Sequence, residues 1–304
     1  MILTVTLNPA LDVTYELDAL SLGAAHRVRR VHERAGGKGV NVARALQALG
    51  RTTTASGLAG GVFRDRLHIE LVEAGLRDEF VDTAVESRRT IVLAPDGQAP
   101  TLFNEPGPEI TGAEWRRFLT RFDDLLRTTE VVTLSGSLPA GMPASAYEEL
   151  TRRAVAVGVP VVLDASGPSL LAALGARPTV IKPNEEELAE LAPGGDVLDG
   201  ARRLHAEGAE RVVVSLGQRG LVSVSAEGVW RATPPEPVVG NPTGAGDAAV
   251  AALAVGIADD ATWEECLRQA VALSASAVTR PLAGEVDRGM AERLRPQIEV
   301  VPAR

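Results

Sequence analysis

Hydrophobic and polar positions follow two different rhythms along the chain. Predominantly apolar runs, typical of buried strands, occur at residues 2–7, 131–134, 159–163 and 211–214. From residue 112 onward such runs alternate with segments of helical periodicity, for example 112–127 and 144–157. This alternation predicts parallel βαβ units, and therefore an α/β fold with a central, mostly parallel sheet flanked by helices.

A second group of strands has no helices between its members. Apolar and polar residues alternate over 11–17, residues 27–34 are also strand-like, and 87–94 with 101–104 form a predicted hairpin around Asp96-Gly97. We therefore expect a small β-sheet lid, with its strands within about 11–34 and 87–104. Because no linker or repeat divides the chain, residues 1–304 are predicted to form a single domain.

The stretch Asn241-Pro242-Thr243-Gly244-Ala245-Gly246-Asp247 precedes an apolar helical run over 245–257. A helix start exposes unpaired backbone N–H groups and partial positive charge, which together bind anions. Gly244 and Gly246 would allow a phosphate to approach those N–H groups closely. Because electrostatics alone would exclude an acid here, Asp247 suggests a proton acceptor for a hydroxyl that attacks phosphorus.

Two other interpretations fit the same residues. The segment is also compatible with a tight turn in which Asp247 is an ordinary helix-start residue. Gly244, Gly246 and Ala249 match the dinucleotide-binding pattern of dehydrogenases. That pattern requires an acid at the end of the next strand, whereas residues 259–263 have the pattern of a helix start. The dehydrogenase interpretation therefore lacks its structural context.

A second glycine-rich segment, Gly36-Gly37-Lys38-Gly39-Val40-Asn41, predicts another site for a polar ligand. It follows four arginines within 27–34, and Asn41 opens a helical run over 42–49. No Ser or Thr follows the lysine, so the segment is not a Walker A loop. Lys38 and Lys182 are the only lysines among 31 basic residues, and a compact ammonium suits a single phosphate oxygen in a confined space.

Polar residues follow several predicted strands, at the edge where open α/β sheets bind ligands. They are Ser135, Ser137, Asp164, Lys182, Asn184 and Ser215. Asn184 and Glu187 are three apart on a predicted helix, so they share a face and offer oxygen ligands suited to Mg²⁺, directly or through water. An acidic helix start is the alternative explanation for this pair. The glycine-punctuated turn over 215–220 is a candidate nucleotide site.

Composition narrows the function further. Hydrophobic residues make up 45% of the 304 residues, enough for a sizeable core, while a net charge of −9 argues against a nucleic-acid partner. Cys266 is the only cysteine, which excludes an internal disulfide and a cysteine-based metal site. No apolar run is long enough to cross a bilayer and no basic leader is visible, so we expect a cytoplasmic protein with no membrane partner.

Six motifs, taken in order, resemble those of the PfkB or ribokinase-like carbohydrate kinase family. They are Asn8-Pro9-Ala10-Leu11-Asp12, Gly36-Gly37-Lys38-Gly39-Val40-Asn41, Ser135-Gly136-Ser137-Leu138-Pro139, Lys182-Pro183-Asn184, Ser215-Leu216-Gly217 and Gly244-Ala245-Gly246-Asp247. Each motif is weak alone, but the ordered set covers essentially the whole chain. Within the family, the chain looks most like the branch of 1-phosphofructokinase and tagatose-6-phosphate kinase. The resemblance implies a ribokinase-like fold and a homodimer formed through the lid sheet.

The resemblance also implies roles for individual residues. Asp247 would be the catalytic base, and the backbone from Gly244 through Ala245 and Gly246 the anion hole. Lys182, Asn184, Ser215, Gly217 and Gly220 would bind ATP, and Asn184 with Glu187 would help place Mg²⁺. Asp12, Gly37 and Asn41 would hold sugar hydroxyls, Arg27, Lys38 and Arg88 the sugar's phosphate, and Ser137 would belong to the same pocket. Two positions depart from the pattern: Thr90 replaces the family's lid Asn, and Thr243 replaces a Val frequent in this branch.

The resemblance and the residues together predict an enzyme that phosphorylates a hexose phosphate with ATP and Mg²⁺. Fructose 1-phosphate, converted to fructose 1,6-bisphosphate, is the first choice of substrate. Tagatose 6-phosphate and fructose 6-phosphate are the alternatives within the family. Two functions of other classes stay open at this point, namely a dehydrogenase and a regulator that binds a nucleotide or sugar phosphate without turnover.

Overall fold

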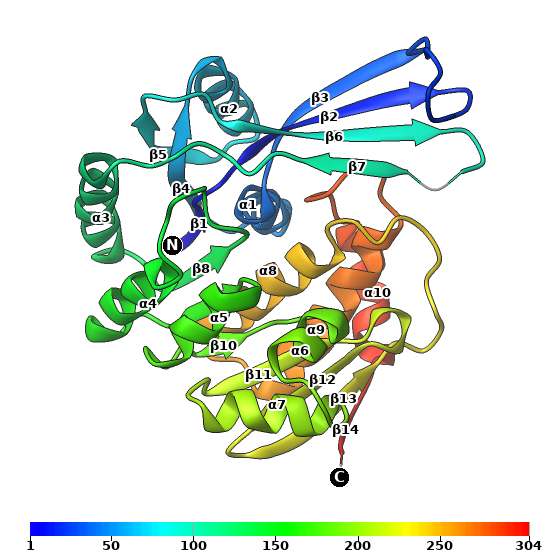
Figure 1. The fold of residues 1–304 in the computed structure, drawn as a ribbon. Coiled ribbons are helices and arrows are strands. Elements are labelled where there is room, and N and C mark those ends of the chain that lie inside the picture. The colour runs from blue at the N-terminus through cyan, green and yellow to red at the C-terminus, as the bar shows by residue number, and fades with distance from the viewer. Residues whose placement is uncertain (99, 304) are drawn as a thin grey trace.

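A ten-stranded sheet forms the centre of the computed structural model, which describes residues 1–98 and 100–303 (Figure 1). Its strands are β1 (Ile2–Thr6), β4 (Thr53–Gly60), β5 (Arg77–Thr83), β8 (Val131–Ser135), β9 (Val161–Asp164), β10 (Val180–Ile181), β11 (Arg211–Ser215), β12 (Leu221–Ser225), β13 (Gly228–Thr233) and β14 (Glu299–Pro302). Their spatial order is β14-β13-β12-β11-β10-β9-β8-β1-β4-β5. The seven strands from β11 to β5 are parallel to their neighbours, and β12, β13 and β14 extend the sheet by antiparallel pairs.

Helices cover both faces of this sheet, as the alternating pattern predicted. They are α1 (Lys38–Ala48), α2 (Val62–Glu73), α3 (Gly112–Leu126), α4 (Ala146–Ala156), α5 (Gly167–Leu174), α6 (Glu185–Leu191), α7 (Val197–Ala206), α8 (Ala245–Ala258), α9 (Trp263–Val278) and α10 (Arg288–Leu294), with short 3₁₀ turns at η1 (Gly217–Arg219) and η2 (Arg295–Gln297). One buried apolar cluster joins the sheet to α3 through α7, and a second joins its other face to α1, α8, α9 and α10. The predicted mostly parallel sheet flanked by helices is therefore confirmed.

A separate four-stranded sheet, which we call the small sheet, lies across the top of the view in Figure 1, above α1 and α8. Its strands are β2 (Ala10–Leu17), β3 (Arg30–Gly36), β6 (Arg88–Pro95) and β7 (Thr101–Asn104), in the order β3-β2-β6-β7. β2 pairs with β3 and β6 with β7 in antiparallel fashion, while β2 and β6 are parallel. The 87–94 and 101–104 hairpin is thus present, with Asp96 and Gly97 in its turn.

The second glycine-rich segment begins a helix earlier than expected. The pattern predicted that Asn41 opens the helix, whereas α1 starts at Lys38 and Gly37 precedes it with a φ of 114°. A Cβ on Gly39 would lie 2.3 Å from Thr6 Oγ1 and 2.7 Å from the Val5 carbonyl, so only glycine lets this helix start sit on the end of β1. The close approach aims the first turn of α1 along the carboxyl ends of the strands.

The apolar helices of this fold are short. Among residues 1–98 and 100–303, none is both long and apolar enough to cross a membrane.

Candidate active site

A cleft of about 710 Å³ opens at the carboxyl ends of the parallel strands and extends under the small sheet. The site residues predicted from the sequence that line it are Asp12, Gly37, Lys38, Asn41, Arg88, Lys182, Asn184, Glu187, Ser215, Gly217, Gly220, Gly244, Ala245, Gly246 and Asp247. The two glycine-rich segments, which the sequence suggested as separate ligand sites, therefore border one cleft. The first turns of α1 and α8 both contribute to its wall.

Asp247 lies in the first turn of α8 and is only 6% exposed. Its Oδ2 accepts a hydrogen bond of 2.9 Å from Nδ2 of Asn41, which joins the starts of α8 and α1. Burial, followed by the nearby Asp164 carboxylate, raises the pKa of Asp247 to about 7 against the opposing effects of Lys38, Asn41 and Lys182. A carboxyl with this pKa exchanges a proton near neutral pH, as a general base requires.

The start of α8 has the geometry of an anion site. Gly244 caps the helix with a φ of 87°, and a Cβ there would lie 2.8 Å from the Ala283 backbone. The position of a Cβ on Gly246 is 3.3 Å from Nζ of Lys182, so this buried ammonium lies beside the helix start. Backbone N–H groups, the helix dipole and a lysine thus place positive charge at one point of the cleft.

Asp164, which the sequence placed only at a strand end, connects the two lysines of the chain. It is the last residue of β9, is 1% exposed, and its Oδ1 lies 3.2 Å from Nζ of Lys38 and 3.6 Å from Nζ of Lys182. Although burial raises its pKa, the ammonium groups of Lys182 and Lys38 hold the pKa of Asp164 below its usual value. Its Oδ2 has no hydrogen-bond partner among the described residues.

The pair Asn184 and Glu187 forms a helix cap at the start of α6. Asn184 Oδ1 accepts a hydrogen bond of 2.8 Å from the Glu187 backbone, and Glu187 Oε2 accepts one of 2.9 Å from the Asn184 backbone. The amide oxygen of Asn184, predicted to serve the metal, is therefore committed to the cap. Oε1 of Glu187 instead points toward Lys38, with 3.8 Å between Oε1 and Nζ.

The oxygen atoms that remain fit a magnesium ion bound together with phosphates. Asp164 offers an unpartnered buried Oδ2 and Glu187 offers Oε1, both of which are hard ligands. Within residues 1–98 and 100–303 no group of three or more His, Cys, Asp or Glu side chains is arranged to hold a metal. Water, or the phosphates of a nucleotide together with water, would have to complete the coordination, because Mg²⁺ usually keeps several of its waters beside one or two carboxylates.

The small sheet supplies the opposite wall of the cleft. Arg88 lines the cleft, and its Nε donates a hydrogen bond of 3.2 Å to the Asn8 carbonyl. Among the described residues, Arg88 forms no salt bridge and no hydrogen bond to a carboxylate. Asp12 lies nearby, and its pKa is raised by burial against the opposing charge of Arg88. A Cβ on Gly36 would lie 1.9 Å from Asp12 Oδ2, so this strand position needs glycine.

Asn104 was missed by the sequence analysis. It lines the cleft and pairs with Thr90 across β6 and β7. Thr90 is the residue that replaces the Asn of the resemblance, so an asparagine is still present at this wall, one strand away. The hairpin register between residues 90 and 104 was the signal that would have found it.

Two predicted site residues do not line the cleft. Arg27 is exposed and precedes β3, because the strand starts at Arg30 and not at residue 27 as the pattern predicted. Ser137 is also exposed, and its Oγ accepts a hydrogen bond of 3.1 Å from Nδ2 of Asn8. In this structure Ser137 thus holds the loop after β1, and its role in binding the sugar stays a prediction.

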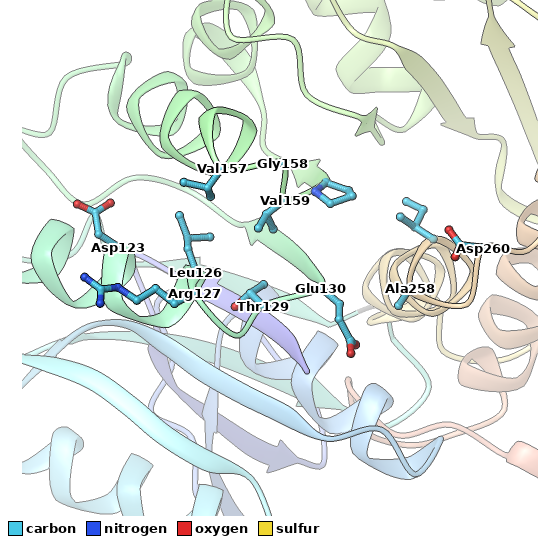
Figure 2. Close-up of a pocket in the computed structure, with 12 residues that line it drawn as sticks. Asp123, Leu126, Arg127, Thr129, Glu130, Val157, Gly158, Val159, Ala258 and Asp260 are labelled. Atoms are coloured by element: carbon cyan, nitrogen blue, oxygen red, sulfur yellow. The ribbon is translucent and has the colours of Figure 1, made fainter.

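A second cavity, of about 480 Å³, lies at the amino ends of the strands (Figure 2). Two of its acidic residues form salt bridges: Asp123 pairs with Arg153 at 2.6 Å, and Glu130 pairs with the amino group of Met1 at 2.7 Å. Val157, Gly158 and Val159, in the loop before β9, form another part of its wall. The groups that suit chemistry on a phosphate are gathered in the larger cleft.

A buried base, two ammonium groups and an anion site at a helix start are the parts that phosphoryl transfer needs, because its catalysis consists mainly of positioning and charge stabilisation. The chain belongs to the pfkB family of carbohydrate kinases, whose family model matches residues 5–288. It is therefore a sugar kinase, and its fold is ribokinase-like, as the motifs predicted.

Solved structures support this assignment. Phosphofructokinase-2 from Escherichia coli, solved with potassium, is 28% identical with a TM-score of 0.89, over 97% of this chain and 98% of that one. A possible 1-phosphofructokinase from Thermotoga maritima is 28% identical with a TM-score of 0.89, over 100% and 99% of the two chains. A ribokinase from Arabidopsis thaliana, at 22% identity and a TM-score of 0.74 over 96% and 98%, shares the fold.

The pKa of Asp247 predicts how stability depends on pH. The folded acid, with a pKa of about 7, binds its proton more tightly than the unfolded one, with a pKa of about 3.9. The wild type should therefore gain stability relative to Asp247→Asn as pH falls from about 7 toward 4, by up to about 1.4 kcal/mol per pH unit. Urea unfolding at pH 7.5 and 5.5, without magnesium, measures the difference.

The matched control for this measurement is Asp260→Asn, at an exposed position just beyond the other end of α8. Its stability should follow that of the wild type at both pH values. A difference between wild type and Asp247→Asn that is the same at pH 7.5 and 5.5 would show that the Asp247 carboxyl has an ordinary pKa.

Proposed function

We propose that this kinase transfers the γ-phosphoryl group of ATP to a hexose phosphate, most specifically to fructose 1-phosphate. The observation that carries the proposal is the Asp247 carboxyl, buried where the starts of α1 and α8 meet and hydrogen-bonded to Asn41. On one side of it lie Lys182 and the helix-start amides, and on the other the small sheet with Arg88. The base thus stands between a place for a nucleotide's phosphates and a place for a phosphorylated sugar.

In the proposed reaction, the oxygen of a sugar hydroxyl forms a bond to the γ-phosphorus, and Asp247 accepts the proton of that hydroxyl. The bond between that phosphorus and the bridging oxygen breaks in line, and ADP leaves with the electron pair. The amides from Gly244 to Asp247 and the ammonium of Lys182 stabilise charge on the transferred group. Closure under the small sheet would exclude water, which otherwise competes as the acceptor.

The nucleotide would lie over the turn that follows β11. Gly217 and Gly220 have φ values of 59° and 84°, and a Cβ on Gly220 would lie 2.0 Å from the Ala232 carbonyl. Ser215 forms a parallel bridge with Asn184, which brings this turn beside the start of α6. Asp164 and Glu187 would hold the magnesium ion, which neutralises charge on the phosphates when bound.

The sugar would lie between α1 and the small sheet, with Asp12, Gly37 and Asn41 near its hydroxyls. Arg88 supplies a cation without a carboxylate partner, which suits bidentate contact with a phosphate. Fructose 1-phosphate is preferred because the chain, by its ordered motifs, looks most like the branch of 1-phosphofructokinase and tagatose-6-phosphate kinase. The Thermotoga maritima relative is described as a possible 1-phosphofructokinase, whereas the Escherichia coli relative was solved with fructose 6-phosphate.

We also propose that two copies of the chain associate through the small sheet. Thr90 and Asn104 face the cleft, so their neighbours Ile91 and Phe103 face away from it. Tyr15, Val31 and Leu93 share that outer face through the strand register. Val31 and Phe103 are 51% and 55% exposed. Such a row of apolar side chains on an exposed sheet face is typical of a surface that another copy covers.

The proposed activity predicts ATP consumption that depends on a hexose phosphate. A coupled assay with fructose 1-phosphate, fructose 6-phosphate and tagatose 6-phosphate should give the highest kcat/KM with fructose 1-phosphate. Asp247→Asn should keep substrate affinity but lower kcat by roughly 10²- to 10⁴-fold, because the proton then has no acceptor. The Asp260→Asn control should turn over normally. Near-normal turnover of Asp247→Asn would remove the base assignment, and a higher kcat/KM with another sugar would replace the substrate.

The two adjacent arginines of β6 offer a matched pair. Arg88 lines the cleft while Arg89 does not, because neighbouring residues of a strand face opposite sides. Arg88→Ala should raise KM for the sugar phosphate by about 10- to 100-fold, with little change in KM for ATP, because it removes a charge-assisted contact. Arg89→Ala should change neither value. Equal increases in both KM values for Arg88→Ala would argue against a role in binding the sugar's phosphate.

The association through the small sheet is tested by neighbouring residues of β7 that differ in their face. Phe103→Glu places a charge on the outer face and should yield monomers, whereas Leu102→Glu, at a position of 54% exposure on the cleft side, should leave the dimer intact. Sedimentation equilibrium distinguishes the two masses. A monomeric wild type would exclude the dimer. A Phe103→Glu variant that stays dimeric would show that the contact lies on another surface.

A further inference from the structure

The ammonium of Lys38 lies between two carboxylates on different elements. Nζ is 3.2 Å from Oδ1 of Asp164, at the end of β9, and 3.8 Å from Oε1 of Glu187, in the first turn of α6. These are the carboxylates that fit a magnesium ion in this cleft. In this structure Lys38 therefore takes the place of the positive charge that a divalent cation would supply there.

This position differs from the one that the resemblance implies. Lys38 was expected to contact the phosphate of the sugar, together with Arg88 of the small sheet. A single ammonium cannot neutralise Asp164 and Glu187 and also bind a phosphate on the other side of the cleft. The two roles therefore exclude each other at any one moment, and an exchange between them is required.

We propose that Lys38 is a displaceable cation: it occupies the Asp164–Glu187 position in the free enzyme, and Mg²⁺ expels it toward the phosphate of the sugar. The inference rests on the proposed function, since it assigns Lys38 a partner within the sugar-phosphate site. It makes Lys38 a positioning residue for the metal and a binding residue for the substrate.

The surroundings of the two lysines differ in the way that this exchange needs. The side chain of Lys38 is 40% exposed, while that of Lys182, which contacts the same Asp164 oxygen, is 4% exposed. Lys38 is also the first residue of α1, where the helix dipole disfavours a cation. The carboxylates hold it against that field, so neutralising them with Mg²⁺ removes the reason for it to stay.

A second observation supports a metal at the same place. Oδ2 of Asp164 is buried without a hydrogen-bond partner among the described residues, although Lys38 and Lys182 both approach Oδ1. A buried carboxylate oxygen without a hydrogen-bond partner destabilises the folded protein, and the lysines do not relieve this because they contact the other oxygen of Asp164. Bound Mg²⁺ or one of its waters would satisfy the atom, which gives the metal an advantage over the ammonium.

The exchange makes a thermodynamic prediction. Because Mg²⁺ releases Lys38 and the sugar phosphate captures it, each ligand should increase the affinity of the enzyme for the other by the same factor. Couplings of this kind are typically roughly 5- to 100-fold. ATP is not needed for the effect, so it can be measured without turnover.

The test measures Mg²⁺ binding by calorimetry, without nucleotide, in the presence and absence of saturating fructose 1-phosphate. The wild type should bind Mg²⁺ at least about fivefold more tightly with the sugar phosphate present. Lys38→Met should bind Mg²⁺ on the order of tenfold more tightly than the wild type without sugar, because a competing charge is gone. In that variant the sugar phosphate should no longer change the affinity for Mg²⁺.

Arg34→Met is the matched control, because Arg34 is a partly buried cation of β3 that donates to the Ala283 carbonyl and touches neither carboxylate. It should retain both the weak Mg²⁺ binding and the coupling. Lys38→Arg keeps the positive charge and should also retain weak Mg²⁺ binding. That result would show that the charge at this position, and not the substitution itself, competes with Mg²⁺. Circular dichroism of every variant confirms that the comparison is between folded proteins.

The outcomes separate this inference from the proposed function. Unchanged or weaker Mg²⁺ binding in Lys38→Met overturns the exchange, whatever sugar is used. A wild type that binds fructose 1-phosphate equally well with and without Mg²⁺ overturns the coupling while leaving the kinase proposal intact. If neither fructose 1-phosphate nor fructose 6-phosphate binds, the proposed substrate class fails, and the Mg²⁺ affinity of Lys38→Met still decides the exchange.

Discussion

The arrangement of this protein depends on holding four charged groups together at the edge of a sheet, three of them almost wholly buried. Asp164 and Asp247 are almost wholly buried, and Lys38 and Lys182 lie beside them. Isolated charges of this kind would be expensive to remove from water, so each must have partners. Asp164 contacts both ammonium groups, while Asp247 accepts an amide hydrogen bond and, among the described residues, forms no salt bridge. Because the two lysines lie against Asp164 and not against Asp247, Asp164 stays charged while Asp247 can exchange a proton.

The fold meets this requirement through small residues. α8 is rich in alanine and valine, and its residues from Asp247 to Gly256 are buried. Without bulky side chains, its start can reach the strand ends beside α1, where Asn41 contacts Asp247. Gly39 does the same for α1, which rests on the end of β1. Low aromatic content is therefore connected directly to the site, because two helix starts must converge on one small volume.

The sequence predicted the layered sheet, the four strands of the small sheet and the charged residues that line the cleft. These features are local, since periodicity and glycine-rich turns are properties of short segments. It did not predict that Asp164 contacts both lysines, because that depends on the register of β8, β9 and β10. It also assigned the Asn184 amide oxygen to metal, although the capping pattern with Glu187 was visible in the sequence and explains where that oxygen is used.

The choice between lysine and arginine follows from whether a cation keeps fixed partners or contacts a ligand in the cleft. Arg44 is buried and fixed, with NH1 donating to the Ala35 carbonyl at 2.6 Å and NH2 to Glu70 at 2.9 Å. The planar guanidinium of Arg44 would lose both of these hydrogen bonds if it moved, so it stays in place. The two lysines both line the cleft, and in the proposed exchange the compact ammonium of Lys38 changes its partner as ligands bind. A chain that uses arginine for nearly every other cation thus keeps lysine where the charge must adapt to a phosphate or a metal.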